Sequence, residues 1–204
     1  MNKNINTFNL WATDGRDEKM EKNHLDSVNE MITIIEENSN NLKSPFNFLD
    51  IGCGNGWVVR RFLEYENCKY SMGIDGAENM IKKAKSYNIG HFEQQNIESY
   101  NYKQKFDIVF SMETLYYIEN IDNFFKNLYE NGLNDGSSFI MGIDHYKENT
   151  SSLDWAEKYN LSLNTLEIND WYNLFSKYRF KNIKIYQHGK KENWEGTLIM
   201  VGNK

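Results

Sequence analysis

The part of this sequence best suited to hold a nucleoside is a glycine-rich turn followed by one acidic residue. Gly52, Gly54 and Gly56 lie directly after an apolar segment, Phe46–Ile51. Because glycine has no Cβ atom, this turn can bend tightly and bring its backbone close to a ligand, and the free N–H groups of a following helix would face the same cleft. Asp75 comes 21 residues after Gly54, where its carboxylate could accept both hydroxyls of an adenosine ribose. The spacing therefore predicts a nucleoside-containing cofactor.

The spacing of the glycines does not fit the NAD-binding pattern GxGxxG. That pattern would place its third glycine at position 57, which is Trp57, whereas the third glycine here is Gly56. A tryptophan at this position would hinder the close helix–strand packing and the approach of a pyrophosphate that the third glycine permits. For Asp75, an N-cap role at the start of the next helix is an alternative to ribose binding.

Candidate acid–base groups follow two later apolar segments with the composition of strands. His145 is the candidate general base because its ordinary pKa lies near neutrality. Glu113 is a candidate for binding a cation on the substrate, and Tyr116 for an aromatic wall beside it. Each has a simpler alternative, since His145 lies in a polar run typical of a solvated surface and Tyr116 could pack a helix against the core. The same rim carries Ser111, Tyr117, Asp144 and Tyr146.

Alternating helical and extended patterns surround these residues. The apolar spacing predicts helices over residues 17–37, 57–65, 77–85 and 121–130 and strands over residues 46–51, 70–74, 91–95, 106–111 and 138–143. The turn residues Asn134-Asp135-Gly136 separate the last helix of this series from its strand. Helices over 151–160 and 169–178 and an antiparallel strand pair, 183–186 and 197–201, complete the chain. Such alternation predicts a parallel sheet with helices on both faces.

Composition and charge exclude several classes of protein. The 204 residues fit one domain, and the net charge of −6 provides no overall positive field for a nucleic acid or an anionic membrane. No stretch approaches the roughly 20 apolar residues of a membrane span. Cys53 and Cys68 have neither disulfide-framework nor zinc-ligand spacing, so we expect no metal and a cytoplasmic location. The first ten residues, rich in Asn, are expected to be irregular.

Four segments together resemble the motifs of class I S-adenosylmethionine (SAM)-dependent methyltransferases. Residues 49–56 resemble motif I, 73–75 the acidic motif of the second strand, and 95–97 the motif after the third strand. Residues 106–111 with 115–118 resemble the fourth strand and its following segment, so that the likeness covers about residues 46–143. More loosely, the segment from Phe8 to His24 resembles the lid-like lead of ubiquinone-biosynthesis-type methyltransferases.

The resemblance implies a fold and a set of cofactor contacts. The fold is α/β, a Rossmann-like three-layer sandwich with a mostly parallel seven-stranded sheet in the order 3-2-1-4-5-7-6 and its last strand antiparallel. Asp75 would bind the ribose, Trp11 would cap the cleft and Arg16 would pair with the cofactor carboxylate, although an ordinary helix packing on the core is the alternative for that segment. At Asn96 the family usually has Asp for the adenine amino group, and an amide oxygen can still accept this bond. The complete set of implied cofactor-binding residues is Trp11, Arg16, Asp50, Gly52, Cys53, Gly54, Asp75, Gly76, Met80, Asn96, Ile97 and Ser111.

The function implied is transfer of the S-methyl group of SAM to a small-molecule acceptor, with S-adenosylhomocysteine (SAH) as product and no metal. A non-catalytic SAM-binding regulatory or partner-dependent module is the alternative. Nucleic-acid methylation is disfavoured because Ser111-Met112-Glu113-Thr114 stands where an Asn/Asp-Pro-Pro-Tyr motif would be. We expect one domain over residues 1–204, a monomer or homodimer, in which residues 1–40 form a lid and leading helix and 144–168 a substrate cover.

Overall fold

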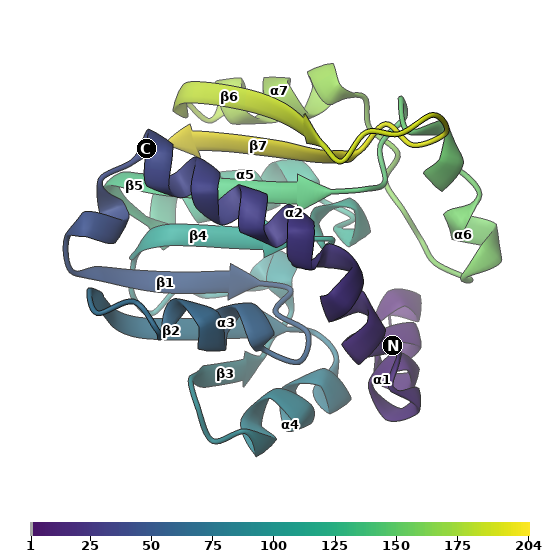
Figure 1. Cartoon of the computed structure of the whole chain (residues 1–204), viewed down its shortest axis with the longest axis horizontal. Coiled ribbons are helices and arrows are strands. Elements are labelled where there is room, and N and C mark those ends of the chain that lie inside the picture. The colour runs from purple at the N-terminus through teal and green to yellow at the C-terminus, as the bar shows by residue number, and fades with distance from the viewer. Residues whose placement is uncertain (1) are drawn as a thin grey trace.

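A seven-stranded sheet forms the centre of the computed structural model, which describes residues 2–204 (Figure 1). The strands lie in the order β3-β2-β1-β4-β5-β7-β6. The first five strands in this order are parallel to one another, and β7 is antiparallel to both β5 and β6. The expected fold class, strand order and reversed last strand are confirmed. The strands are β1 (Phe46–Ile51), β2 (Cys68–Asp75), β3 (His91–Gln94), β4 (Phe106–Met112), β5 (Leu133–Ile143), β6 (Lys181–His188) and β7 (Thr197–Asn203).

Two helical layers bury the two faces of this sheet. Side chains of a strand point alternately to opposite faces, so Phe48 of β1 packs with helices α2 and α3 on one face while Leu49 joins α5 and α7 on the other. Among residues 2–204, none of the helices combines the length and apolar character needed to cross a membrane. The helices are α1 (Lys3–Asp14), α2 (Arg16–Asn38), α3 (Trp57–Phe62), α4 (Glu78–Ser86), α5 (Ile121–Asn127), α6 (Trp155–Lys158) and α7 (Ile168–Lys177).

The N-terminal residues are helical rather than irregular, with Met1 outside the described residues. The side chain of Asn2 caps α1 by accepting from the backbone N–H of Asn4. The helix ends at Gly15, whose φ of 77° is left-handed, and α2 begins at the next residue. Little in the sequence indicated α1, because its first residues are rich in Asn. Its position over the carboxyl ends of the strands (Figure 1) depends on contacts with distant segments.

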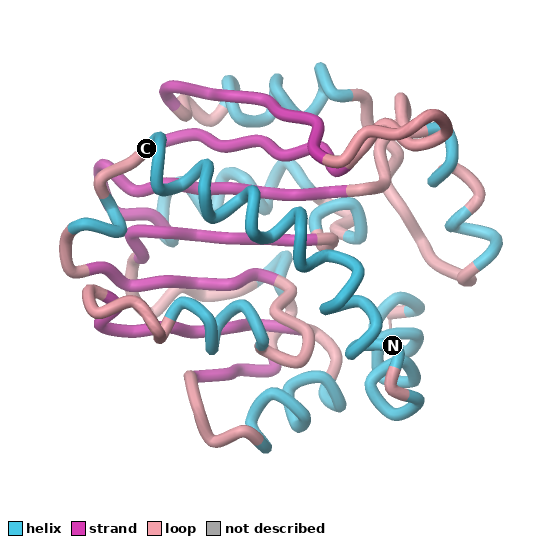
Figure 2. The backbone as a smooth tube through the Cα atoms, viewed as in Figure 1, coloured by secondary structure: helices cyan, strands magenta, loops and turns pink. Residues whose placement is uncertain are grey.

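Two further elements differ from their expected bounds. Strand β5 begins at Leu133, so the expected turn at Asn134-Asp135-Gly136 lies inside the strand as a bulge between its pairings with Phe106 and Ile108. The expected helix over 151–160 is replaced by two short pieces, a 3₁₀ turn at Thr150–Ser152 and the single turn of α6. In Figure 2 the chain between β5 and α7 runs as loops and these short helical pieces beyond the carboxyl ends of the strands. Those strand ends therefore lie beneath α1 on one side and the 144–168 segment on the other.

Candidate active site

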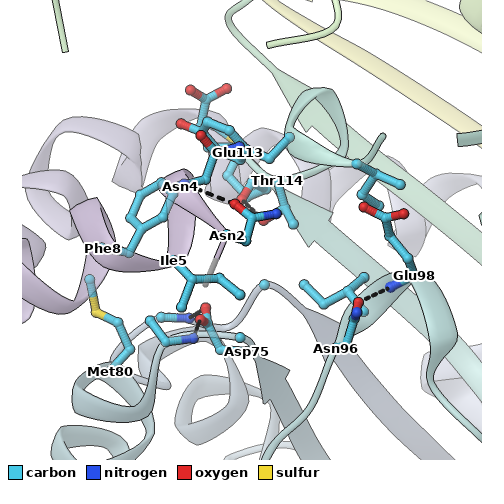
Figure 3. A pocket seen from close by; sticks show the side chains of 18 of the residues that line it. Asn2, Asn4, Ile5, Phe8, Asp75, Met80, Asn96, Glu98, Glu113 and Thr114 are labelled. Carbon is cyan, nitrogen blue, oxygen red and sulfur yellow. Dashed lines mark hydrogen bonds between the residues drawn. The ribbon is translucent and has the colours of Figure 1, made fainter. Parts of the chain in front are cut away.

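A cleft opens above the carboxyl ends of β1, β2 and β4, where the glycine turn, α1 and α4 meet (Figure 3). The turn is held in place because the N–H groups of Gly52 and Cys53 both donate to the carbonyl of Ile74, at 2.8 and 3.1 Å. A Cβ atom on Gly52 would lie 1.9 Å from the hydroxyl oxygen of Thr114. At Gly54, the same addition would meet nothing within 4 Å. The turn is therefore closely packed at Gly52 and open to the cleft at Gly54, as a cradle for a ligand requires.

Asp75 is the acidic group at the centre of this cleft. Its Oδ2 accepts from the N–H of Gly54 at 3.0 Å and its Oδ1 from the N–H of Ala77 at 2.7 Å. Burial raises the pKa of the Asp75 carboxyl, and these two hydrogen bonds oppose the rise. Each carboxylate oxygen keeps acceptor capacity for a further donor, as a ribose diol needs. The N-cap of α4 is Ala77, so Asp75 does not take the capping role considered as its alternative.

Four more of the expected cofactor residues line the same cleft: Gly76, Met80, Asn96 and Ile97. The amide oxygen of Asn96 accepts from the N–H of Glu98 at 3.0 Å, which fixes the direction of that side chain (Figure 3). Ile5 of α1 lies over Gly76, where a Cβ atom would come within 3.0 Å of its Cδ1. The first helix therefore closes one side of the region expected to hold the adenosine.

A second part of the cleft continues on the other side of the glycine turn and contains Asp50 and Cys53. Asp50 is almost wholly buried, and its pKa is raised by burial and then by the charge of Asp75. Asp17 of α2 is also buried there; its carboxylate accepts from the Asn55 amide at 3.1 Å and pairs with the ammonium of Lys83 at 2.8 Å. Asp17, which the sequence did not single out, therefore joins the leading helix to both the glycine turn and α4.

Arg16 and Ser111, two of the expected cofactor residues, line neither part of the cleft. Arg16 points to solvent, with 56% of its side chain exposed, and pairs with Asp14 at 3.0 Å. Ser111 is fully buried beneath the cleft, where its hydroxyl donates to the carbonyl of Ile51 at 3.0 Å. The structure thus gives Ser111 a role in joining β4 to β1, and it places the Arg16 side chain at the surface, away from the cleft.

A larger cavity of about 500 Å³ adjoins the cleft. Trp11, expected to cap the cofactor, lines this cavity instead, together with Tyr116. Met20 and Glu113 line the cavity and both parts of the cleft, and His24 lines the cavity and the second part. The three spaces therefore meet at the side chains of Met20, His24 and Glu113.

Glu113 holds an unusual position at this junction. Its φ of 56° lies in the left-handed region, which a residue with a side chain adopts at an energetic cost and which is enriched at functional sites. Its carboxylate accepts from the Tyr116 hydroxyl at 2.6 Å and from the backbone N–H of Asp144. Burial raises its pKa well above the usual value, and the charge of Asp144 adds to that rise.

Asp144 and His24 complete a group of three with Glu113. Their ligand-type atoms all lie within 4.8 Å of one another, the kind of convergence that could hold a cation or a metal ion. Burial raises the pKa of Asp144 to about 6, against the hydrogen bond from Thr197 that lowers it. Burial also lowers the pKa of His24 to about 4, so its imidazole is neutral near pH 7. Only Glu113 and Asp144 of this group were candidates from the strand ends; His24 comes from the middle of α2.

His145, the expected general base, lies apart from this group. Its ring nitrogens lie 3.0 Å from the carbonyl oxygen of Ser152 and 2.8 Å from the hydroxyl of Thr165. The side chain is 1% exposed and does not line the cavity. The structure therefore makes His145 an anchor of the 144–168 segment to the end of β5 rather than a group that faces an acceptor.

The first helix connects the two sides of the site. Asn4 exchanges two hydrogen bonds of 2.8 Å with the backbone of Ser162, in the 144–168 segment. Asn9 accepts from the N–H of Asn79 at 2.8 Å and so ties the same helix to the first turn of α4. Helix α1 therefore connects the first turn of α4 to the 144–168 segment, whose residues Trp155, Tyr159 and Leu161 line the adjoining cavity.

Comparison with known proteins gives the same assignment of family. A family model described as a methyltransferase domain matches residues 42–188. Malonyl-[acyl-carrier protein] O-methyltransferase 2 of Ilyobacter polytropus is 31% identical over 134 residues, which cover 60% of this chain and 51% of that protein. The chain spans about half, or less, of the length of the curated relatives it matches.

Two solved structures share the fold at low sequence identity. A Haloferax volcanii structure, described as a complex between the Trm112 methyltransferase activator and a methyltransferase, has a TM-score of 0.80 at 20% identity and covers 96% of both chains. A Thermotoga maritima SAM-dependent methyltransferase, described as a candidate histamine N-methyltransferase, has a TM-score of 0.74 at 16% identity and covers 97% of this chain and 99% of that one. With the glycine turn, Asp75 and the strand order in place, the chain belongs to the class I SAM-dependent methyltransferases.

Proposed function

We propose that this methyltransferase transfers the S-methyl group of SAM to a small molecule held in the aromatic-lined cavity beside the cofactor cleft. The observation that carries the proposal is the junction at Met20, His24 and Glu113. A cofactor whose ribose binds Asp75 would extend across the glycine turn toward this junction. Its reactive end would then face the cavity, where an acceptor could approach in line.

The residues of the cleft divide into binding roles under this proposal. Asp75 would accept the ribose hydroxyls, and Gly54 would allow the backbone to approach the methionyl part. Met80, Asn96 and Ile97 would bind the adenine, and Asp50 would act on the methionyl end through water or by orienting the turn. Bound in this way, SAM supplies an activated methyl group, and the chain needs chiefly to align the acceptor and exclude water.

Residues 1–40 and 144–168 would form the lid and the acceptor cover. Support for both comes from the hydrogen bonds between Asn4 and Ser162, which join α1 to the cover. A cytoplasmic location is also part of the proposal, because Cys53 and Cys68 are both free thiols and unpaired cysteines are typical of reducing compartments. The curated relatives are named for methylation of malonyl-[acyl-carrier protein]. We propose a smaller acceptor for this chain because the cavity is bounded by side chains on several sides.

A partner-dependent SAM-binding module is the second candidate. The Haloferax neighbour, solved with an activator protein, is the observation that favours it. The two candidates differ in whether the chain alone produces SAH, so the test is a screen of amines, thiols, phenols and carboxylates with SAM and the purified chain. We expect acceptor-dependent release of SAH. Tight binding of SAM with no transfer to any class would favour the partner-dependent module.

A further inference from the structure

The inner end of the acceptor cavity is acidic. Glu113 and Asp144 lie there, and their hydrogen-bond donors are a tyrosine hydroxyl, a backbone N–H and the hydroxyl of Thr197. All of these donors are neutral. Within residues 2–204, Lys191 is the one lysine or arginine that lines the cavity, and it is an exposed residue of the β6–β7 loop. Two neighbouring carboxyl groups therefore face the cavity with neutral donors as their partners.

Away from this inner end, the ionisable groups that line the cavity are Lys191, His188 and Asp26. The imidazole of His188 lies 2.9 Å from the carboxylate of Asp26. That pair leaves the inner carboxyl groups as the charged feature that an acceptor would meet next to the cofactor. His24, neutral because burial lowers its pKa to about 4, adds no positive charge there near pH 7.

Aromatic side chains form the wall that leads to these carboxyl groups. Trp11 packs edge-on against Tyr159 at 5.9 Å between ring centroids, and Trp155 stacks with Trp194 at 6.3 Å. Aromatic faces attract organic cations, and a carboxylate beside them strengthens the attraction. The complete aromatic lining is Trp11, Tyr116, Tyr117, Trp155, Tyr159 and Trp194.

We propose that the methyl acceptor is an organic amine, whose ammonium group binds between Glu113 and Asp144 while its carbon skeleton lies against the aromatic wall. This inference rests on the proposed function, because it names the class of substrate for the same cavity. It is supported by the strained backbone at Glu113, which places that carboxylate at the junction with the cofactor cleft. At pH 7.5 Asp144 is mostly ionised, since its pKa is about 6.

Methyl transfer to such an amine begins with the loss of one proton. The bound ammonium gives one proton to the Asp144 carboxylate, which leaves a lone pair on nitrogen. That nitrogen attacks the methyl carbon, the carbon–sulfur bond breaks, and its electron pair stays on the sulfur of SAH. The product is a methylated ammonium ion, and Asp144 releases its proton to water through the mouth of the cavity. No oxidant, reductant or metal enters the balance.

Other occupants fit the cavity less well. A carboxylate acceptor, such as the malonyl group in the names of the curated relatives, would bring a further negative charge next to the Asp144 carboxylate, and like charges at short distance repel. A divalent metal ion would suit the group of His24, Glu113 and Asp144 but would make no use of the aromatic wall. An amine satisfies both features at once.

The test uses the full chain saturated with SAH and three probes that share one aromatic arm: 2-phenylethylamine, 2-phenylethanol and 3-phenylpropanoate. Calorimetry of each probe is repeated with Asp144→Asn. This substitution keeps the shape of the side chain, and residue 144 lines the cavity but neither part of the cofactor cleft. Asp154→Asn is the matched control, because it removes the same charge from an exposed position beside the cavity. Affinity for SAH, measured first, establishes that each variant is folded and binds the cofactor.

We expect the amine to bind at least about tenfold more tightly than the other two probes, and Asp144→Asn to remove most of that preference, since a charge-assisted hydrogen bond is lost. Asp154→Asn should keep it. Four outcomes would overturn the inference and leave the methyltransferase proposal intact. They are equal binding of the three probes, preference for the carboxylate, no amine binding by an SAH-saturated chain, and Zn²⁺ binding that displaces the amine. Failure of the wild-type chain to bind SAH would instead overturn the proposed function.

Discussion

Replacing Asp75 with alanine should weaken SAH binding by about 10- to 150-fold. The carboxylate lies in the cleft with one backbone N–H on each oxygen, so its remaining lone pairs face the ligand. A hydrogen bond to a charged group contributes about 1.5–3 kcal/mol, and we count one such contribution because both ribose hydroxyls share a single carboxylate. Titration calorimetry with SAH measures the loss directly.

The matched control is Glu78→Ala, three residues away in the first turn of α4, where the side chain is exposed and pairs with Lys82. It should bind SAH like the wild type. A second measurement uses the 2′-deoxy analogue of SAH, which should bind the wild type more weakly but lose little further affinity in Asp75→Ala, because the partner of the missing hydroxyl is already gone. Ribose binding by Asp75 would be refuted if Asp75→Ala bound SAH as tightly as the wild type does. It would also be refuted if Asp75→Ala weakened binding of the 2′-deoxy analogue as much as it weakens binding of SAH.

Three other changes test the surrounding site. Arg16→Ala should leave SAH affinity within about twofold, since an exposed ion pair contributes little. Asp17→Asn should weaken SAH binding several-fold, because it loosens α2 from the glycine turn. A larger loss of affinity in Arg16→Ala than in Asp17→Asn, measured by calorimetry, would contradict the placement of these two side chains. Gly52→Ala should lower the melting temperature and SAH affinity together, because its Cβ would overlap Thr114; an unchanged melting temperature would contradict the packing of the turn. His24 has a folded pKa of about 4, below its unfolded value, so its contribution to stability is complete above about pH 6.5. That contribution is lost as the pH falls toward 4, by up to about 3 kcal/mol. Between pH 7 and 4.5 the free energy of unfolding should therefore fall less for His24→Gln than for the wild type, and equal losses would exclude this linkage.

The cofactor half of the site could be predicted because its signals are local. The glycine turn, the apolar strand before it and the acidic residue at the end of the next strand lie within a short stretch, and a parallel sheet brings those strand ends to one edge. Gly52, Gly54, Asp75, Asn96 and similar positions therefore line the cleft. The sheet order followed from the resemblance, and the structure confirms it.

Two of the expected residues point away from the site, while the residue next to each of them in the sequence points into it. Adjacent residues of a helix point about 100° apart, so Asp17 faces the cleft while Arg16 faces solvent. Beyond the end of β5, Asp144 lines the cavity while the next side chain, His145, turns into the cover. A sequence pattern locates such a rim without fixing which of two neighbouring side chains points inward.

The acceptor side was the least predictable part. Its junction combines Met20 and His24 from α2 with Glu113 after β4 and Asp144 after β5. These positions are up to about 120 residues apart in the sequence, and no local pattern links them. Helix α1, which reaches Ser162 and Asn79 from one polar segment, depends in the same way on contacts that only the folded chain brings together.

In the proposed complex, the reactive methyl group of SAM lies at the junction between the cofactor cleft and the acceptor cavity. This placement can be tested without knowing the acceptor, by recording nuclear Overhauser contacts from SAM labelled with ¹³C at its methyl group in complex with the full chain. We expect contacts from the labelled methyl to the side chains of Met20 and His24. Contacts confined to the opposite end of the cleft, at Asn96 and Ile97, would contradict it.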